Sequence, residues 1–202
     1  MAATARRLLD ASTLCAIATV TADVSAHVNS AYFAWSRDFH IVWLSEPRAR
    51  HSRNLRVNNS VAIAVYDSTQ TWGTPDRGIQ LFGSAREVGG ENDNQAETLY
   101  AKRFPDFTET DLGAYGFYVF RARRLKLFDE RALGAGTFVT ARLTRDRRLA
   151  WERGSPHAPT SRSIRRTTAS GPAPVALCGR STGRIGRAER GEAVADSVAE
   201  VD

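Results

Sequence analysis

Most of the chain before residue 153 carries the apolar patterns of β-strands. Leu14–Val20 is an almost continuous apolar run, as expected for a strand that is buried on both faces. Phe39–Leu44 and Ser60–Tyr66 are rich in β-branched and aromatic residues, which favour strands. Ala26–Trp35 alternates between two faces with polar residues at its centre, so it suits either a strand that lines a ligand or an ordinary barrel strand with satisfied polar groups.

Further strands and short helices follow the same reasoning. The later strand candidates are Gly78–Val88, Gly116–Arg121, Arg124–Asp129, Thr137–Arg142 and Leu149–Glu152. Gly116–Arg121 and Arg124–Asp129 are either two strands or one bent strand. Apolar residues have helical spacing in Thr4–Ala11 and in Gln95–Phe104. Pro105 is expected to end the second of these helices. Residues 1–152 are therefore predicted to form one mainly β (α+β) domain with short flanking helices.

The composition changes at residue 153. Residues 153–202 are rich in Gly, Pro, Ser, Thr, Ala and Arg and have almost no aromatic or periodic apolar signal. Such a segment cannot bury enough apolar surface to offset the entropy of ordering it. This part of the chain is predicted to be a disordered tail.

A basic connection joins the strands Phe39–Leu44 and Ser60–Tyr66. It opens with Ser, Glu and Pro at positions 45 to 47, which predict a helix start, because a hydroxyl or carboxylate can cap there and Pro is tolerated in the first turn. The basic residues that follow are Arg48, Arg50, His51, Arg53 and Arg56. Free backbone N–H groups and guanidinium groups at a helix N-terminus favour the binding of a phosphate.

This connection resembles the flavin-binding segment of the pyridoxamine 5′-phosphate oxidase-like family, the FMN-binding split β-barrels. In that family a strand ends in Ser or Thr, and a basic pair a few residues later holds the FMN phosphate. The matching positions are Ser45, Arg50 and His51, and lysine is common in the family at the last of them. The resemblance runs from Leu8 to Val139, through the segments Ala18–Trp35, Gly78–Val88 and Arg124–Val139.

The resemblance implies a six- to seven-stranded antiparallel split β-barrel that binds FMN, or a deazaflavin, and forms a homodimer with the flavin between its subunits. It places Asn29, Ser30 and Ala31 under the flavin ring. It also implies that Gln80 hydrogen-bonds the polar edge of the ring, because a glutamine both donates and accepts. The alternative for Gln80 is a strand glutamine in contact with solvent.

Two loops carry further expectations. Family members usually have Gly where Val24 stands, and a β-branched residue is poorly suited to positive φ. The turn Ala22–Ser25 is therefore expected to adopt another type. Trp72, in the polar loop Asp67–Arg77, either covers a bound ring or packs that loop onto its own domain.

Two departures from the family argue against vitamin B6 as the substrate. The usual C-terminal motif, a Trp followed by Arg, His and Arg, is absent, since Trp151 precedes Glu152 and Arg153. Tyr100 and Arg103 stand three residues apart, without the spacing and the serine of the family's substrate-phosphate set, so that role is not transferred to them.

Charge and composition reduce the number of possible partners and locations. The net charge is +6 and the pI is about 9.9, but the charge is spread along the chain, which argues against nucleic acid as the partner. No apolar run is long enough to span a bilayer and no signal peptide is found, so a cytoplasmic location is expected. The four histidines lack partners at metal-ligand spacing, and no metal site is predicted.

The sequence thus predicts an FMN-dependent oxidoreductase that acts on an unidentified small molecule. No catalytic side chain is assigned, because in such proteins the flavin carries out the redox chemistry. The alternative is a protein that binds or senses flavin, deazaflavin or haem without turnover.

Overall fold

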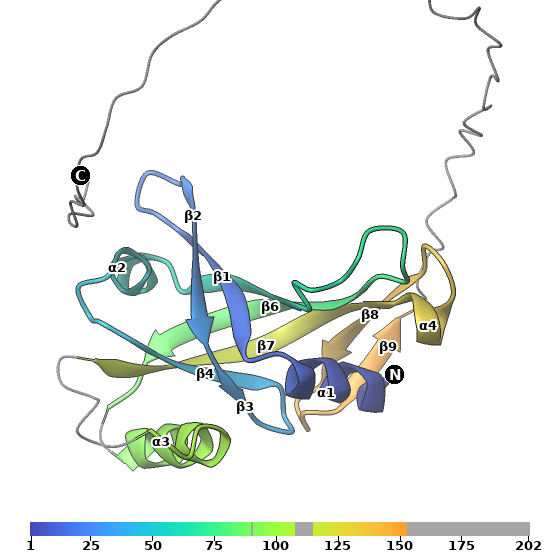
Figure 1. Cartoon of the computed structure of the whole chain (residues 1–202). Coiled ribbons are helices and arrows are strands. Elements are labelled where there is room, and N and C mark those ends of the chain that lie inside the picture. Colours follow the sequence, from blue (N-terminus) through green and yellow to red (C-terminus); the bar gives the residue numbers. More distant parts are fainter. Residues whose placement is uncertain (90, 108–114, 153–202) are drawn as a thin grey trace, which may run out of the picture. The chain divides into compact units, whose positions relative to one another are not determined.

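The computed structural model describes residues 1–89, 91–107 and 115–152, which form an antiparallel sheet wound into a split barrel (Figure 1). The strands are β1 (Leu14–Val20), β2 (Ala26–Tyr32), β3 (Ala34–Trp35), β4 (His40–Ser45), β5 (Ser60–Tyr66), β6 (Arg77–Glu87), β7 (Gly116–Asp129), β8 (Phe138–Leu143) and β9 (Leu149–Glu152). The helices are α1 (Ala2–Ala11), α2 (Arg50–Val57), α3 (Glu91–Arg103) and α4 (Glu130–Leu133). The prediction of a mainly β split barrel with short helices is confirmed, whereas the predicted disordered tail lies outside the described residues.

The sheet is split at the place where β2 passes into β3. The strand order is β2-β1-β5-β6-β7-β4-β3, so β2 and β3 lie at its two ends, yet only Phe33 separates them along the chain. β2 pairs with β1 from Val20↔Ala26 to Leu14↔Tyr32, and β3 pairs with β4. Chain continuity, rather than a hydrogen-bonded ladder, brings the two ends of the sheet together. β2 therefore keeps one edge without a strand partner among the described residues.

β7 joins the barrel to an outer extension of the sheet. Its first part pairs with β4 and its last part pairs with β8, which in turn pairs with β9. The two strand candidates Gly116–Arg121 and Arg124–Asp129 are thus one continuous strand. The neighbouring strand β6 shifts register against it between Phe82 and Gly83, which marks a β-bulge.

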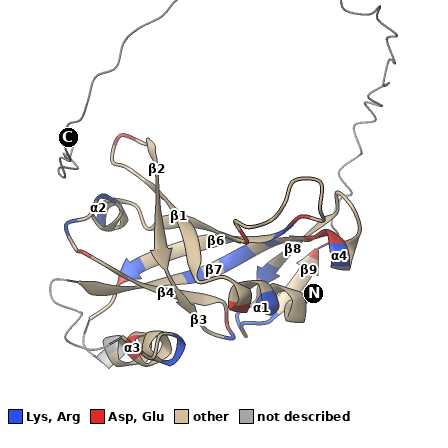
Figure 2. Cartoon of the chain, in the orientation of Figure 1, with Lys and Arg blue, Asp and Glu red and all other residues tan. Residues whose placement is uncertain are grey.

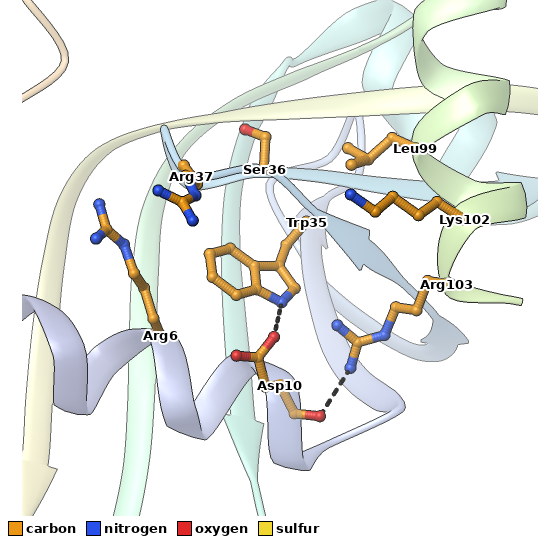
Figure 3. A pocket seen from close by; sticks show the side chains of 8 residues that line it. All are labelled: Arg6, Asp10, Trp35, Ser36, Arg37, Leu99, Lys102 and Arg103. Carbon is orange, nitrogen blue, oxygen red and sulfur yellow. Dashed lines mark hydrogen bonds between the residues drawn. The ribbon is translucent and has the colours of Figure 1, made fainter.

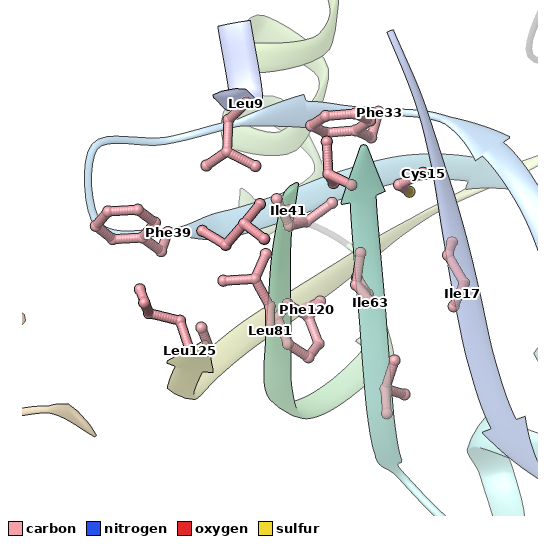
Figure 4. Close-up of a cluster of buried hydrophobic side chains, with 14 of the residues drawn as sticks. Leu9, Cys15, Ile17, Phe33, Phe39, Ile41, Ile63, Leu81, Phe120 and Leu125 are labelled. Carbon is pink, nitrogen blue, oxygen red and sulfur yellow. The ribbon is translucent and has the colours of Figure 1, made fainter. Parts of the chain in front are cut away.

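The barrel interior is filled with apolar side chains (Figure 4). The largest fully buried ones are Trp43, Tyr118, Phe33, Phe39, Phe120, Leu9, Ile17, Ile41, Ile63, Ile79, Leu81 and Leu125. Trp43 and Tyr118 stack across the β4–β7 pair with ring centroids 5.6 Å apart. Burial raises the pKa of the Cys15 thiol to about 12, so Cys15 is a packing residue without thiolate character.

Helix α3 packs on the outer face of β4 and β7 and ties that face to α1. Tyr100 is buried there and makes edge contacts with the rings of Phe107 and Phe117. Arg103, at the end of α3, donates to the carbonyl oxygens of Leu9 (2.8 Å) and Ser12. α3 is therefore fixed beside the split of the barrel.

Figure 2 shows Lys and Arg on α2, α3 and α4 and on strands β6, β7 and β8, so positive charge is distributed over many elements. Within the described residues, no helix has the length and apolar character needed to cross a membrane.

The hairpin turn between β1 and β2 differs from the prediction. Val24 adopts φ +67°, the left-handed conformation that its β-branched side chain disfavours, so the turn has not changed type to suit it. The turn is held by hydrogen bonds of the Thr21 hydroxyl with both the N–H and the C=O of Ser25. These hydrogen bonds and the register of the two strands fix the conformation of the loop, so the backbone of Val24 is held in a strained conformation.

Replacing Val24 with glycine is expected to raise the free energy of unfolding by about 1 kcal/mol, because glycine adopts positive φ without strain and this gain exceeds its entropy cost. The side chain is 82% exposed, so little packing is lost. Thermal denaturation measures the change, and Val24→Ala is the matched control, because it keeps a Cβ and should gain less. A less stable glycine variant would show that the turn carries no strain.

Candidate functional site

A cleft opens where the barrel is split, between the end of β4 and the edge of β2 that has no strand partner in the described part of the chain. Its volume is about 390 Å³. Its lining residues are Asn29, Ser30, Ala31, Tyr32, Leu44, Ser45, His51, Tyr100, Phe107 and Tyr115. Five of the seven predicted cofactor-binding residues, Asn29, Ser30, Ala31, Ser45 and His51, thus lie around one cavity.

One wall of this cleft is β2. Because β2 pairs only with β1 among the described strands, alternate backbone N–H and C=O groups along its other edge have no strand partner. The side-chain oxygen Oδ1 of Asn29 is buried and has no hydrogen-bond partner within the described chain. A buried acceptor without a partner is costly, and a ligand that donates a hydrogen bond would remove that cost.

The opposite end of the cleft is formed by Ser45 and the first turn of α2. The Ser45 Oγ lies 2.5 Å from Nε2 of His51, and the Ser52 hydroxyl donates to Ser45 Oγ at 3.3 Å. The helix is held against β1 by a buried hydrogen bond from the Asn54 side-chain amide to Oγ1 of Thr19 (2.9 Å). Two hydroxyls and an imidazole are therefore positioned at a helix N-terminus, where an anion is favoured.

His51 is a neutral group in this arrangement. Burial and the neighbouring His27 lower the pKa of its imidazole below the ordinary value. The two imidazole rings stack with centroids 6.4 Å apart and an interplanar angle of 10°. At neutral pH, His51 consequently offers a hydrogen bond rather than a full positive charge.

The helix begins later than predicted. α2 starts at Arg50 with Ala49 as its N-cap and no side-chain cap, whereas Ser45 is still paired with Gly116 in the β4–β7 ladder. A turn closed by the Ala49 N–H and the Glu46 carbonyl oxygen lies between the strand and the helix. The Ser45 hydroxyl is consequently free to face His51 instead of capping the helix.

The basic residues between β4 and β5 do not form one cluster. Arg48, in the turn before α2, pairs with Glu46 at 3.5 Å, and Arg56, in the last turn of α2, pairs with Glu87 at 3.2 Å. Arg50 is exposed on the first turn of the helix, has no ion pair among the described residues and does not line the cleft. It is the cation nearest along the chain to His51.

Gln80 lies apart from the cleft. It lines a separate hollow of about 210 Å³ together with Lys126, Phe128 and other residues of β6, β7 and the segment around β8. Strands β1 and β5 stand between β6 and β2 in the sheet, which separates Gln80 from Asn29. The fold of the chain does not bring Gln80 to the other predicted residues.

The aromatic residues that line the cleft were not predicted from the sequence. Tyr100 and Phe107 reach it because α3 packs across β4 and β7, and no local pattern signals that packing. Tyr32 directly follows the predicted residues on β2, and its aromatic side chain at that position could have indicated that it lines the cleft.

Trp72 is 99% exposed, so it neither packs its loop onto the domain nor covers the cleft. No group of three or more potential metal ligands is found in the described part of the chain.

The fold is a split barrel with a cleft at the split. The sequence matches the family described as pyridoxamine 5′-phosphate oxidase over residues 1–129, and the chain belongs to this family. The resemblance seen in the sequence is thereby confirmed. A comparison with curated proteins found no match.

Solved structures share the fold. A haem-binding protein from Mycobacterium smegmatis is 20% identical with a TM-score of 0.54, and the match covers 70% of this chain and 58% of that one. The haem storage protein HutZ from Vibrio cholerae is 20% identical with a TM-score of 0.51, covering 61% and 91%. A Clostridium acetobutylicum protein of the pyridoxinephosphate oxidase family is 12% identical with a TM-score of 0.53, covering 70% and 94%. At these identities the likeness establishes the fold alone.

Proposed function

We propose that this protein is an FMN-dependent oxidoreductase that acts on a small molecule other than vitamin B6. The observation that carries the proposal is the cleft itself. It has an anion-favouring helix start at one end, and along one wall it has a buried Asn29 Oδ1 and a strand edge that both lack a partner among the described residues. A molecule with a phosphate at one end and a flat ring with polar edges fits this arrangement. Family membership supports FMN as that molecule.

The residues proposed to hold FMN divide into two groups. Ser45 and His51 line the cleft and would hold the phosphate by hydrogen bonds, and the exposed Arg50, which lies beside the cleft, would turn toward it and add charge. Asn29 and the backbone edge at Ser30 and Ala31 would pair with the donors and acceptors on the ring edge, which fixes the ring's orientation and excludes water from one face. When bound, FMN supplies the hydride or electron transfer, so the chain needs no nucleophile or acid–base pair of its own.

The proposal includes a homodimer. Val28 and Tyr32 on β2 are 60% and 58% exposed, so large apolar side chains stand beside the cleft on the same strand. A second subunit that covers this strand would bury them and close the cleft toward solvent. The small-molecule substrate would then reach the flavin at the subunit boundary.

A second candidate is haem binding without turnover, and the His27–His51 pair favours it. Neutral imidazole is a common iron ligand, and the lowered pKa keeps His51 in that form. In this case the aromatic wall of Tyr100 and Phe107 would pack against the macrocycle. A deazaflavin would use the same cleft as FMN.

The absorbance spectrum of the purified protein, with the mass of the molecule released on denaturation, tests these alternatives. The expected result is a flavin spectrum, the mass of FMN, and bleaching by a nicotinamide donor. A Soret band would favour haem, and a flavin that no physiological donor reduces would favour storage or sensing. Failure of the protein to bind added FMN would refute the proposal.

The contribution of His51 to FMN affinity is expected to increase as the pH falls from 8 to 6. A bound phosphate raises the pKa of His51 from its lowered value, so His51 takes up a proton on binding, and proton uptake is favoured at low pH. His51→Lys should bind FMN about fivefold more tightly than the wild type at pH 8, as for a partly exposed ion pair of about 1 kcal/mol. This difference in affinity should shrink at pH 6, and the comparison of the two proteins cancels the titration of the FMN phosphate itself.

Fluorescence titration with FMN at the two pH values measures this effect. Val57→Lys is the matched control, because it adds the same charge at the far, exposed end of α2. Equal increases of FMN affinity in His51→Lys and Val57→Lys would show that the effect comes from net charge and not from a contact at position 51.

A further inference from the structure

A second and larger hollow lies between α1, the turn after β3, and α3 (Figure 3). Its volume is about 630 Å³, and it shares no lining residue with the cleft beside β2. Its lining residues are Arg6, Asp10, Trp35, Ser36, Arg37, Leu99, Lys102 and Arg103. Four side chains of positive charge thus face one of negative charge.

Two of these charges are already used inside the protein. The Asp10 carboxylate accepts a hydrogen bond from Nε1 of Trp35 at 3.1 Å. The Arg103 guanidinium donates to carbonyl oxygens at the end of α1, among them that of Asp10 (Figure 3). It also lies 4.8 Å above the centre of the Phe33 ring. Both groups therefore build the wall of the hollow.

Three cations remain for a ligand. Arg6, Arg37 and Lys102 come from three different elements around the Trp35 indole (Figure 3), and none has an ion pair within the described residues. Nε of Arg6 is buried and lacks a hydrogen-bond partner in the same part of the chain. An unpartnered buried guanidinium nitrogen is costly, and an anion in the hollow would pair it.

An adjoining hollow extends the positive region. It has a volume of about 360 Å³ and shares Ser36 and Leu99 with the first hollow. Its charged lining residues are Arg86 and Arg121, from strands β6 and β7, and Asp38, so positive charge exceeds negative charge there by one. Burial, Arg147 and Arg121 lower the pKa of the neighbouring His40 to about 4, so its imidazole is uncharged at neutral pH. The two hollows together can accept more than one anionic group.

Trp35 supplies a flat apolar face among these cations. The hydrogen bond to Asp10 and the contact with the Phe39 ring, whose centroid is 6.3 Å away, hold the indole in place. A fixed indole favours a planar ring as its partner. The concave shape favours a small molecule over a nucleic-acid strand, which binds along extended basic stripes.

We propose that this hollow binds a small molecule that combines a planar ring with phosphate groups, a ligand of the nucleoside-phosphate class. The ring lies against Trp35, and the phosphates are held by Arg37, Lys102 and Arg6, with Arg86 and Arg121 within the adjoining hollow for a second anionic group. The site is separate from the proposed flavin cleft and does not depend on it.

Isothermal titration calorimetry of the full-length protein with ADP tests the proposal, with pyrophosphate as the probe without a ring and adenosine as the probe without charge. ADP should bind more tightly than either. The double variant Arg37→Ala/Lys102→Ala should bind ADP about tenfold or more weakly than the wild type. Trp35→Leu should reduce the difference in affinity between ADP and pyrophosphate, because it removes the surface that contacts the ring. Both deleted cations are exposed, so the fold is expected to persist.

Two control variants make the result specific. Arg123→Ala/Arg145→Ala removes two exposed cations outside both hollows, and Arg50→Ala removes the cation proposed to hold the FMN phosphate. Both variants should keep the ADP affinity of the wild type. Absence of ADP binding, an unchanged affinity in Arg37→Ala/Lys102→Ala, or loss of ADP binding in Arg50→Ala would overturn the proposal. Pyrophosphate binding as tight as that of ADP would overturn the assigned ligand class. The same holds if a DNA duplex binds more tightly than ADP, in a salt-sensitive way that depends on Arg37 and Lys102.

Discussion

Replacing Gly83 with alanine is expected to lower the free energy of unfolding by about 3 kcal/mol, at the upper end of the costs of overpacking. A Cβ at this position would lie 2.0 Å from the carbonyl oxygen of Arg121 and 2.9 Å from its carbonyl carbon. These are backbone atoms of the neighbouring strand β7, so they cannot move without disturbing the ladder. The close approach coincides with the bulge between Phe82 and Gly83.

Chemical denaturation of wild type, Gly83→Ala and Gly116→Ala measures this cost. Gly116 is the matched control because it also lies in the sheet, but its added Cβ would meet the Glu87 side chain and no backbone atom, with Oε1 at 3.3 Å and Cγ at 4.0 Å. That side chain can turn away, so the expected loss is below about 0.5 kcal/mol. Similar losses in both variants would show that strand propensity, and not the contact with Arg121, sets the cost.

Replacing Arg50 with alanine is expected to weaken FMN binding by more than about tenfold, because a charge-assisted contact with a phosphate contributes about 1.5–3 kcal/mol. Arg50 is the first residue of α2 and has no internal ion pair in the described part of the chain. Its side chain is therefore available to turn toward a phosphate held by Ser45 and His51. Truncation should leave the fold intact, since the side chain is exposed.

Equilibrium titration of the unliganded protein with FMN gives the affinity. Arg56→Ala is the matched control, since it removes the same charge from the opposite end of the helix, where Arg56 already pairs with Glu87 at 3.2 Å. Affinity that is unchanged in Arg50→Ala, or reduced equally in both variants, would remove Arg50 from the phosphate site.

Local sequence was sufficient to locate most strands and part of the cleft. Strands β1, β4 and β5 lie within a residue of the predicted ranges, because their β-branched and aromatic runs leave little choice of conformation. Ser45 and His51 are only six residues apart on either side of one turn, so a strand followed by a helix brings them together. Asn29, Ser30 and Ala31 join them because β2 passes into β3 beside the end of β4.

Local sequence failed where non-local pairing decided the conformation. Ser45 was expected to begin a helix, but its pairing with Gly116 keeps it in the strand and delays the helix to Arg50. Val24 was expected to avoid positive φ, but the register of the β1–β2 hairpin imposes it. Tertiary constraints worth several hydrogen bonds exceed a local preference of about 1–2 kcal/mol.

By itself, the sequence determined that this chain forms a mainly β domain, since alternating and continuous apolar runs have few low-energy solutions. The match of residues 1–129 to the family model, and not the apolar pattern, places the chain in the pyridoxamine 5′-phosphate oxidase family. Only the tertiary structure decided which polar residues meet. It placed Asn29 and His51 around one cleft, separated Gln80 from it, and gathered Arg6, Arg37 and Lys102 around Trp35. The physical reason is that such neighbours lie on elements far apart along the chain, and the packing of a buried core, not local propensity, fixes how those elements meet.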